Sequence, residues 1–186
     1  AGREKLSILV IGGGGYVFPR YVEKAWPGSS IDVVEIDRGV TEAAIRAFGL
    51  ERNTTIKTIT MDARNYIDQL LQQQQRTGRK KLYDFIYGDA VNDYAVPFQL
   101  LTKEFNDKIS DVLADDGLYM LTVIDVYELG SYLGAVVNTL KQTFAEVYVM
   151  TEARMPDWAR NTFVVIAAKR RLDVSDIIAK QRQEIN

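Results

Sequence analysis

The alternation of short apolar runs with longer stretches of helical periodicity constrains this chain more than any other feature of its sequence. Five runs are rich in Val, Ile, Tyr or Thr and too continuously apolar for a half-exposed sheet: Leu6 to Ile11, Ile31 to Ile36, Thr55 to Met61, Tyr83 to Tyr87 and Gly117 to Ile124. The helical stretches are Tyr16 to Trp26, Val40 to Phe48, Ala63 to Gln75, Phe98 to Leu113 and Tyr127 to Phe144. This order predicts βα units around a buried parallel sheet with helices on both faces.

The end of the chain breaks the alternation. Glu146 to Thr151 and Asn161 to Lys169 are strand-like, and the loop between them is too short for a crossover helix, so these strands must be antiparallel. We therefore expect an α/β fold: a doubly wound, seven-stranded, mostly parallel sheet that ends in an antiparallel hairpin. This Rossmann-like arrangement is typical of methyltransferases rather than dehydrogenases. Asp173 to Glu184 predicts a terminal amphipathic helix.

Composition limits the chemistry that the chain can perform. The 186 residues include no His and no Cys, which excludes Ser-His-Asp and Cys-His nucleophiles, zinc sites built on imidazole or thiolate, and iron–sulfur ligation. Acid–base chemistry must use carboxylates, Tyr, Lys or water, and we expect no bound metal.

Charge and hydropathy bear on partners and location. Lys and Arg number 23 against 25 Asp and Glu, so the sequence carries no nucleic-acid footprint. No apolar run is long enough to cross a membrane, and we expect no membrane contact by this chain itself. We expect one domain over residues 1–186 and a cytoplasmic location. The abrupt start, with a strand soon after Ala1, is compatible with a piece of a longer chain, such as the soluble domain of a membrane-attached protein.

A glycine run follows the first apolar run directly. Gly12, Gly13, Gly14 and Gly15 allow a tight turn and a close approach of the backbone to a ligand over the next helix N-terminus. A dinucleotide fingerprint would place a further Gly or Ala at Val17 or Phe18. Bulky residues there argue against a bound pyrophosphate and favour an adenosine-type ligand. The alternative is a tight turn without a ligand.

Acidic residues end the second and third strands. Glu35 and Asp37 lie where ribose hydroxyls would bind, and spacing alone does not decide which is the ligand and which caps the following helix. Asp62 could accept a hydrogen bond from the exocyclic amine of adenine, or it could cap the helix that starts at Ala63.

The loop after the fourth strand is the most informative segment. It contains Asp89, Asn92, Asp93 and Tyr94, and it should lie beside the switch point where strands one and four are neighbours. Asp89 could deprotonate an amine nucleophile or hold it by charge. The alternative is that Asp89 only bonds the backbone of its own loop. Tyr94 is a candidate neighbour of the site.

Taken together, these segments resemble the spermidine synthase (polyamine aminopropyltransferase) branch of the S-adenosylmethionine-dependent methyltransferase superfamily. The resemblance spans Leu6 to Lys169, and Asp89 to Phe105 is especially similar to spermidine synthase-like domains that are often attached to membrane segments. The matching segments are Ile8 to Gly14, Val33 to Asp37, Met61 to Arg64, Tyr83 to Asp89 and Leu101 to Phe105.

The resemblance implies a transferase of the polyamine-biosynthesis type. Its co-substrate would be S-adenosylmethionine or decarboxylated S-adenosylmethionine, its partners a small amine and a second copy of the chain in a homodimer. It implies that Glu35 binds ribose, that Asp62 and Ala63 contact adenine, and that Asp89 activates the amine. The expected cofactor-binding residues are Gly12, Gly13, Gly14, Glu35, Ile36, Asp62, Ala63 and Asp89, with Asp89 also catalytic and Asp93 and Tyr94 as candidate substrate contacts.

The sequence also departs from that family. An aspartate normally follows the glycines, but Gly15 stands in its place, and the second loop acid comes one residue late, at Asp93. The family's N-terminal β-hairpin region has no counterpart in these residues. Two alternatives therefore stay open: an S-adenosylmethionine-dependent methyltransferase, and a catalytically degenerate nucleoside-binding or interaction module.

Overall fold

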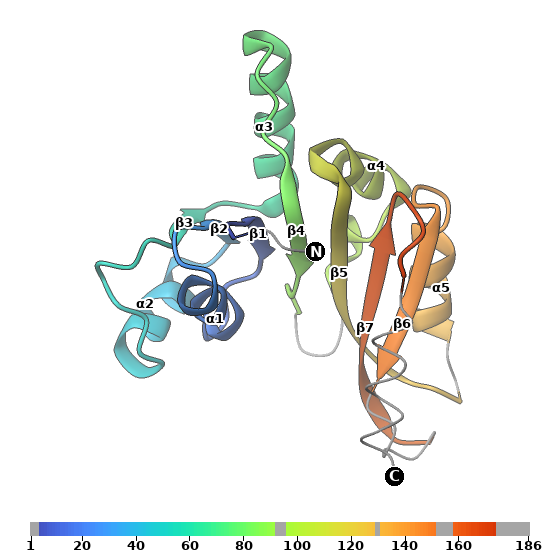
Figure 1. The fold of residues 1–186 in the computed structure, drawn as a ribbon. Helices are drawn as coiled ribbons and strands as arrows, with labels where there is room; N and C mark the ends of the chain where they lie inside the picture. Colours follow the sequence, from blue (N-terminus) through green and yellow to red (C-terminus); the bar gives the residue numbers. More distant parts are fainter. Residues whose placement is uncertain (1–3, 92–95, 129–130, 152–157, 174–186) are drawn as a thin grey trace.

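The computed structural model describes residues 4–91, 96–128, 131–151 and 158–173 (Figure 1). These residues form a seven-stranded sheet with the order β3-β2-β1-β4-β5-β7-β6. Strands β1 to β5 are parallel, and β7 is antiparallel to both β5 and β6. The predicted fold class is thereby confirmed. The strands are β1 (Ser7–Ile11), β2 (Ser30–Glu35), β3 (Lys57–Thr60), β4 (Tyr83–Gly88), β5 (Leu113–Val126), β6 (Glu146–Thr151) and β7 (Arg160–Ala168).

Helices cover both faces of the sheet because successive strand residues point to opposite sides. In β1, Ile8 and Val10 pack into a cluster with residues of α1 and α2, whereas Leu9 and Ile11 pack into a cluster with residues of α3, α4 and α5. The helices are α1 (Val17–Ala25), α2 (Arg38–Ala47), α3 (Ala63–Thr77), the single 3₁₀ turn η1 (Phe98–Leu100), α4 (Lys103–Val112) and α5 (Ser131–Leu140).

The predicted helix from Phe98 to Leu113 is wrong in its first part. The chain forms η1, and α4 then starts afresh because Thr102 caps it, its Oγ1 accepting from the amide of Phe105 at 3.2 Å. At the other end the backbone turns extended at Leu113, which pairs with Tyr83, so β5 begins before the predicted Gly117.

Two further expectations concern helices near the end of the chain. The predicted helix from Tyr127 to Phe144 is shorter in the structure, where α5 covers Ser131–Leu140. The predicted terminal helix lies outside the described residues except for Asp173. None of the helices in the described ranges is long and apolar enough to cross a membrane.

A buried carboxylate ties three elements together on the α3 face. Asp32 of β2 is 2% exposed, and its Oδ2 accepts from the hydroxyls of Tyr83 at 2.6 Å and Tyr66 at 3.1 Å and from the ammonium of Lys81. Burial by itself raises the pKa of Asp32, but these donors outweigh it and hold the pKa below its ordinary value. Burial also raises the pKa of Tyr66 to about 12.

Replacing this carboxylate tests its structural role. Asp32→Asn should lower the free energy of unfolding at pH 7 by about 1 to 3 kcal/mol, since Lys81 can turn to solvent but the phenols lose a charged acceptor. Because the folded pKa is depressed, the contribution of Asp32 exists above the unfolded value of about 3.9 and disappears as pH falls below it. The difference between wild type and variant in urea unfolding should therefore shrink below about pH 4.

The exposed acid Asp111 of α4 supplies the matched control. Asp111→Asn should change stability by less than about 0.5 kcal/mol. An Asp32→Asn effect no larger than this control, or one that stays constant down to pH 2.5, would contradict the assignment.

Candidate functional site

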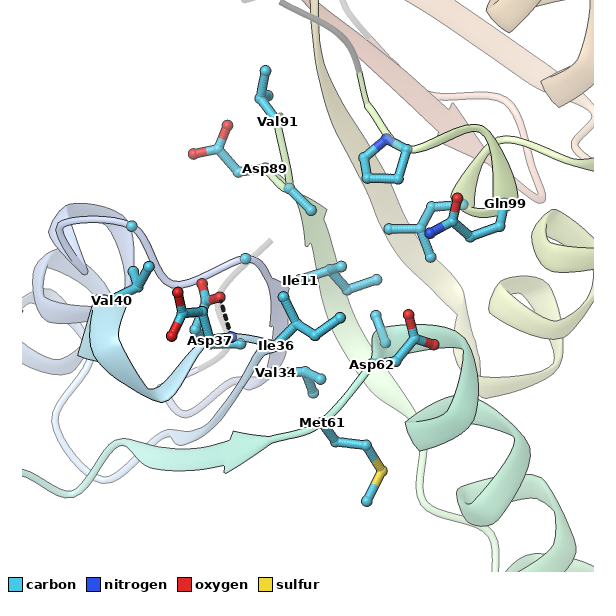
Figure 2. A pocket seen from close by; sticks show the side chains of 17 residues that line it. Ile11, Val34, Ile36, Asp37, Val40, Met61, Asp62, Asp89, Val91 and Gln99 are labelled. Atoms are coloured by element: carbon cyan, nitrogen blue, oxygen red, sulfur yellow. Dashed lines mark hydrogen bonds between the residues drawn. The ribbon is translucent and has the colours of Figure 1, made fainter. Parts of the chain in front are cut away.

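A cavity of about 450 Å³ opens at the carboxyl ends of β1, β2, β3 and β4 (Figure 2). It lies beside the contact of β1 with β4, which is the switch point where open α/β sheets bind ligands. Its lining is Ile11, Gly12, Gly14, Val34, Glu35, Ile36, Asp37, Val40, Met61, Asp62, Ala63, Asp89, Ala90, Val91, Pro97, Gln99 and Leu100.

The structure brings most of the predicted site residues to this one cavity. Asp93 and Tyr94 lie outside the described residues, and Gly13 is not part of the lining. The predicted residues that do line the cavity are Gly12, Gly14, Glu35, Ile36, Asp62, Ala63 and Asp89.

Gly12 is where the ends of β1 and β4 come closest. Its φ is +96°, and a Cβ there would lie 2.7 Å from the carbonyl oxygen of Asp89. The amide of Asp89 donates to the carbonyl of Ile11 at 2.8 Å, and the amide of Gly12 donates to Val34 at 2.9 Å. Only glycine fits this approach, because any side chain would push the two strand ends apart.

Gly13 serves a different purpose from its neighbour. A Cβ at Gly13 would lie 2.6 Å from the ring of Tyr16, a fully buried residue with φ of 56° that precedes α1. The Tyr16 hydroxyl hydrogen-bonds to Thr41 at 3.0 Å and Thr58 at 3.2 Å. The prediction that a helix starts at Tyr16 is off by one residue, and this tyrosine instead anchors the glycine turn.

The structure distinguishes the two acids at the end of β2. Asp37 caps α2, since its Oδ1 accepts from the amide of Gly39 at 2.7 Å. Glu35 is 7% exposed; its Oε2 accepts from the amide of Gly13 at 2.7 Å and its Oε1 from the amide of Asp37 at 2.9 Å. Each carboxylate oxygen can accept more than one hydrogen bond, so Glu35 can still receive a ligand hydroxyl.

Asp62 and Ile36 both line the cavity, one with a carboxylate and the other with an apolar side chain. Asp62 caps α3 through its Oδ1, which accepts from Asn65 at 3.1 Å, and it also lines the cavity. The capping alternative therefore holds without removing Asp62 from the site. Ile36 is apolar yet 68% exposed at the cavity wall, an arrangement typical of a surface that a flat ligand covers.

Asp89, unlike the lining acids Asp37 and Asp62, does not lie at the N-cap of a helix. Burial raises its pKa, and a hydrogen bond with Thr122 offsets this only in part. Gly88 pairs with Leu121, which brings the next residues, Asp89 and Thr122, side by side. Thr122 is 8% exposed and also bonds the hydroxyl of Tyr87 at 2.8 Å. A partly buried carboxylate with a raised pKa is suited to accept a proton from an amine.

Sequence reasoning missed Thr122, Tyr87 and Gln99. Tyr87 could have been found, because it lies two residues before Asp89 on the same face of β4. Gln99 lines the cavity and Thr122 of β5 lies beside Asp89, and no sequence pattern indicates that either residue lies near the site.

No metal centre is evident in the parts of the chain that the structure describes: no three acidic side chains there are grouped so that they could hold an ion.

The fold and the position of the cavity define a class I methyltransferase-type Rossmann domain. The sequence matches the family described as spermine/spermidine synthase domain over residues 2–176, and the chain belongs to that family.

Curated relatives divide between two activities. The chain is 33% identical over 142 residues to a polyamine aminopropyltransferase of Vibrio vulnificus, a match covering 76% of the chain and 44% of that protein. It is 29% identical over 150 residues to the human eEF1A lysine and N-terminal methyltransferase, covering 77% of the chain and 21% of that protein. The chain thus spans less than half the length of these relatives.

Solved structures support the fold. Human methyltransferase-like protein 13 in complex with SAH superimposes with a TM-score of 0.78 at 24% identity, covering 94% of this chain and 78% of that one. A probable spermidine synthase from Corynebacterium glutamicum gives a TM-score of 0.77 at 22% identity, covering 91% of this chain and 58% of that one.

The close approach of the β1 and β4 ends at Gly12 gives a stability prediction. Gly12→Ala should destabilise the chain by about 3 kcal/mol or more, because the methyl group adds a clash with Asp89 to the strain of a positive φ. Gly78 is the matched control, since its φ is also positive, at +68°, but a Cβ there meets nothing within 4 Å. Gly78→Ala should cost only about 1 to 2 kcal/mol. Equal losses of unfolding free energy for the two variants in urea would contradict a steric requirement for glycine at Gly12.

Proposed function

We propose that this domain binds decarboxylated S-adenosylmethionine and transfers its aminopropyl group to a small amine. The observation that carries the proposal is the charge of the cavity. Its charged lining residues are Glu35, Asp37, Asp62 and Asp89, and no Lys or Arg is among the described residues of the lining (Figure 2).

This charge favours one form of the co-substrate. Decarboxylated S-adenosylmethionine carries a sulfonium and an ammonium, both attracted by carboxylates. S-adenosylmethionine carries an additional carboxylate, which the acidic lining repels and no basic lining residue neutralises. An acceptor amine, cationic before it reacts, is drawn to the same lining.

The residues suggest how the nucleoside lies. Glu35, fixed by two backbone amides, would accept from the ribose hydroxyls, and Asp62 and Ala63 would contact adenine. Gly12 and Gly14 leave room for the sulfonium end. A cavity of about 450 Å³ suits a ligand of this size. The complex of human methyltransferase-like protein 13 with SAH supports an adenosyl ligand in this fold.

Asp89 would act as the base. Asp89 takes a proton from the ammonium of the acceptor. The neutral amine then attacks the aminopropyl carbon bonded to sulfur; the new carbon–nitrogen bond forms as the carbon–sulfur bond breaks, and the electron pair of the broken bond goes to sulfur. The products are the neutral thioether 5′-methylthioadenosine and an aminopropylated ammonium, and the proton on Asp89 passes to water. Burial raises the pKa of Asp89 and so strengthens it as a base.

Methyl transfer is the competing function, since the methyltransferase relatives are 29% identical and no acid follows the glycines at Gly15. The two activities differ in the thioether that they release. Methyl transfer leaves S-adenosylhomocysteine, and aminopropyl transfer leaves 5′-methylthioadenosine. Mass spectrometry of a reaction with both co-substrates and a panel of diamines, polyamines and peptide amines separates them.

The preference between co-substrates is itself a prediction. In calorimetric titrations in one buffer, decarboxylated S-adenosylmethionine should bind at least about tenfold more tightly than S-adenosylmethionine, because the extra carboxylate is unpaired in the cavity. 5′-Methylthioadenosine serves as the reference without either charged arm. A preference for S-adenosylmethionine would favour methyl transfer, and binding of none of the three compounds would favour a degenerate module.

A variant at Asp89 tests the base. Asp89→Asn should lower the transfer rate at least about 100-fold while nucleoside affinity stays within about tenfold, since the amide keeps the shape but takes no proton. In the wild type, the acid limb of the pH–rate profile should lie above about pH 4, because the pKa of Asp89 is raised. Asp111→Asn is the control. Full turnover by Asp89→Asn would remove this residue from the mechanism.

A further inference from the structure

The cavity wall opposite β2 is built by a segment with little structure of its own. It consists of η1 and the proline before it. Within it, the amide of Leu100 donates to the carbonyl of Pro97 at 2.9 Å, and the amide of Leu101 donates to the carbonyl of Phe98 at 3.0 Å. Figure 2 shows the side-chain amide of Gln99 directed into the cavity from this wall, on the same side as Asp62.

Arg64 of α3 holds this wall in place. Its Nη1 donates to the carbonyl of Gln99 at 2.7 Å and to Oγ1 of Thr102 at 3.3 Å, and its guanidinium lies over the ring of Phe105, 6.0 Å from the ring centre. Thr102 is the cap of α4, so Arg64 links the wall to a helix start as well.

The same helix start supplies the other side of this part of the cavity. Asp62 caps α3, and Arg64 follows it by two residues in the first turn. Arg64 therefore fixes the backbone of Gln99 relative to the start of α3, where Asp62 lies. A carboxylate that accepts and a carboxamide that donates can together recognise the hydrogen-bonding edge of a flat base.

We propose that Gln99, positioned by Arg64, acts with Asp62 to select adenine over other purines in the bound nucleoside. This inference rests on the proposed function. Asp62 offers only acceptors and accepts a hydrogen bond from the exocyclic amine of adenine, while the Gln99 amide donates a hydrogen bond to a neighbouring ring nitrogen. Hypoxanthine fits poorly, because its carbonyl oxygen replaces the amine and faces the Asp62 carboxylate.

Nucleoside analogues test the selection without any turnover. Wild type should bind 5′-methylthioadenosine at least about tenfold more tightly than 5′-methylthioinosine in calorimetry. Gln99→Leu should lower affinity for the adenine compound about tenfold and affect the inosine compound much less. Gln99→Glu, which presents only acceptors, should abolish the preference. Gln72→Leu, at an exposed position of α3, is the matched control.

The ratio of the affinities for 5′-methylthioadenosine and 5′-methylthioinosine also tests Arg64 as a positioning residue. Arg64→Lys keeps the charge but loses the planar guanidinium, so the preference for adenine should fall about threefold or more. Arg76→Lys, exposed in the last turn of α3, is its control. A purely structural role would lower the unfolding temperature and leave the ratio of affinities unchanged.

The outcomes separate this inference from the proposed function. If wild type binds 5′-methylthioadenosine but Gln99→Leu and Gln99→Glu keep its preference, the role of Gln99 is disproved and the nucleoside site stands. If wild type binds neither compound, the proposed function fails and the inference fails with it. Loss of the preference in both Gln99 variants, with unfolding transitions like that of the control, establishes the selection.

Discussion

The close contact between the ends of β1 and β4 governs the rest of the site. Asp89 donates its amide to Ile11, and its carbonyl lies where a side chain on Gly12 would have to be. This contact fixes Asp89 next to the glycine turn, and the bond from Gly13 to Glu35 fixes the turn from its other side. The position of the proposed base relative to the proposed ribose ligand is thus set by backbone hydrogen bonds rather than by flexible side chains.

The acids of the cavity have more than one duty. Glu35, Asp37 and Asp62 each accept hydrogen bonds from backbone amides at a turn or a helix start. Replacing any of these carboxylates would weaken an element of the fold. Asp89 differs, because its carboxylate engages Thr122 instead of a helix end. It can change protonation state without uncapping a helix, as a base must in each turnover.

The sequence predicts the sheet, its antiparallel end and the acids at the strand ends, because periodicity and composition are local properties of the chain. It leaves open whether Glu35 or Asp37 caps α2, since both lie on one face and only the three-dimensional contact with Gly13 separates them. The role of Gly13 depends on the ring of Tyr16, whose left-handed backbone no pattern indicates. The wall around Gln99 depends on Arg64, 35 residues away in the chain.

The glycine turn explains why selectivity must come from the cavity as a whole. A Cβ at Gly15 would meet the ring of Phe48 at 3.4 Å and Val17 at 3.7 Å, so the position where the family carries an acid lies against apolar side chains. A carboxylate there would lie beside these apolar side chains and lose part of its hydration. Under the proposed function, Asp89 is the acid that would meet the amine near the sulfonium, and the other acidic lining residues would act on the amine through their summed field. Such a field attracts cations in general, so the shape of the cavity must select which amine is the acceptor.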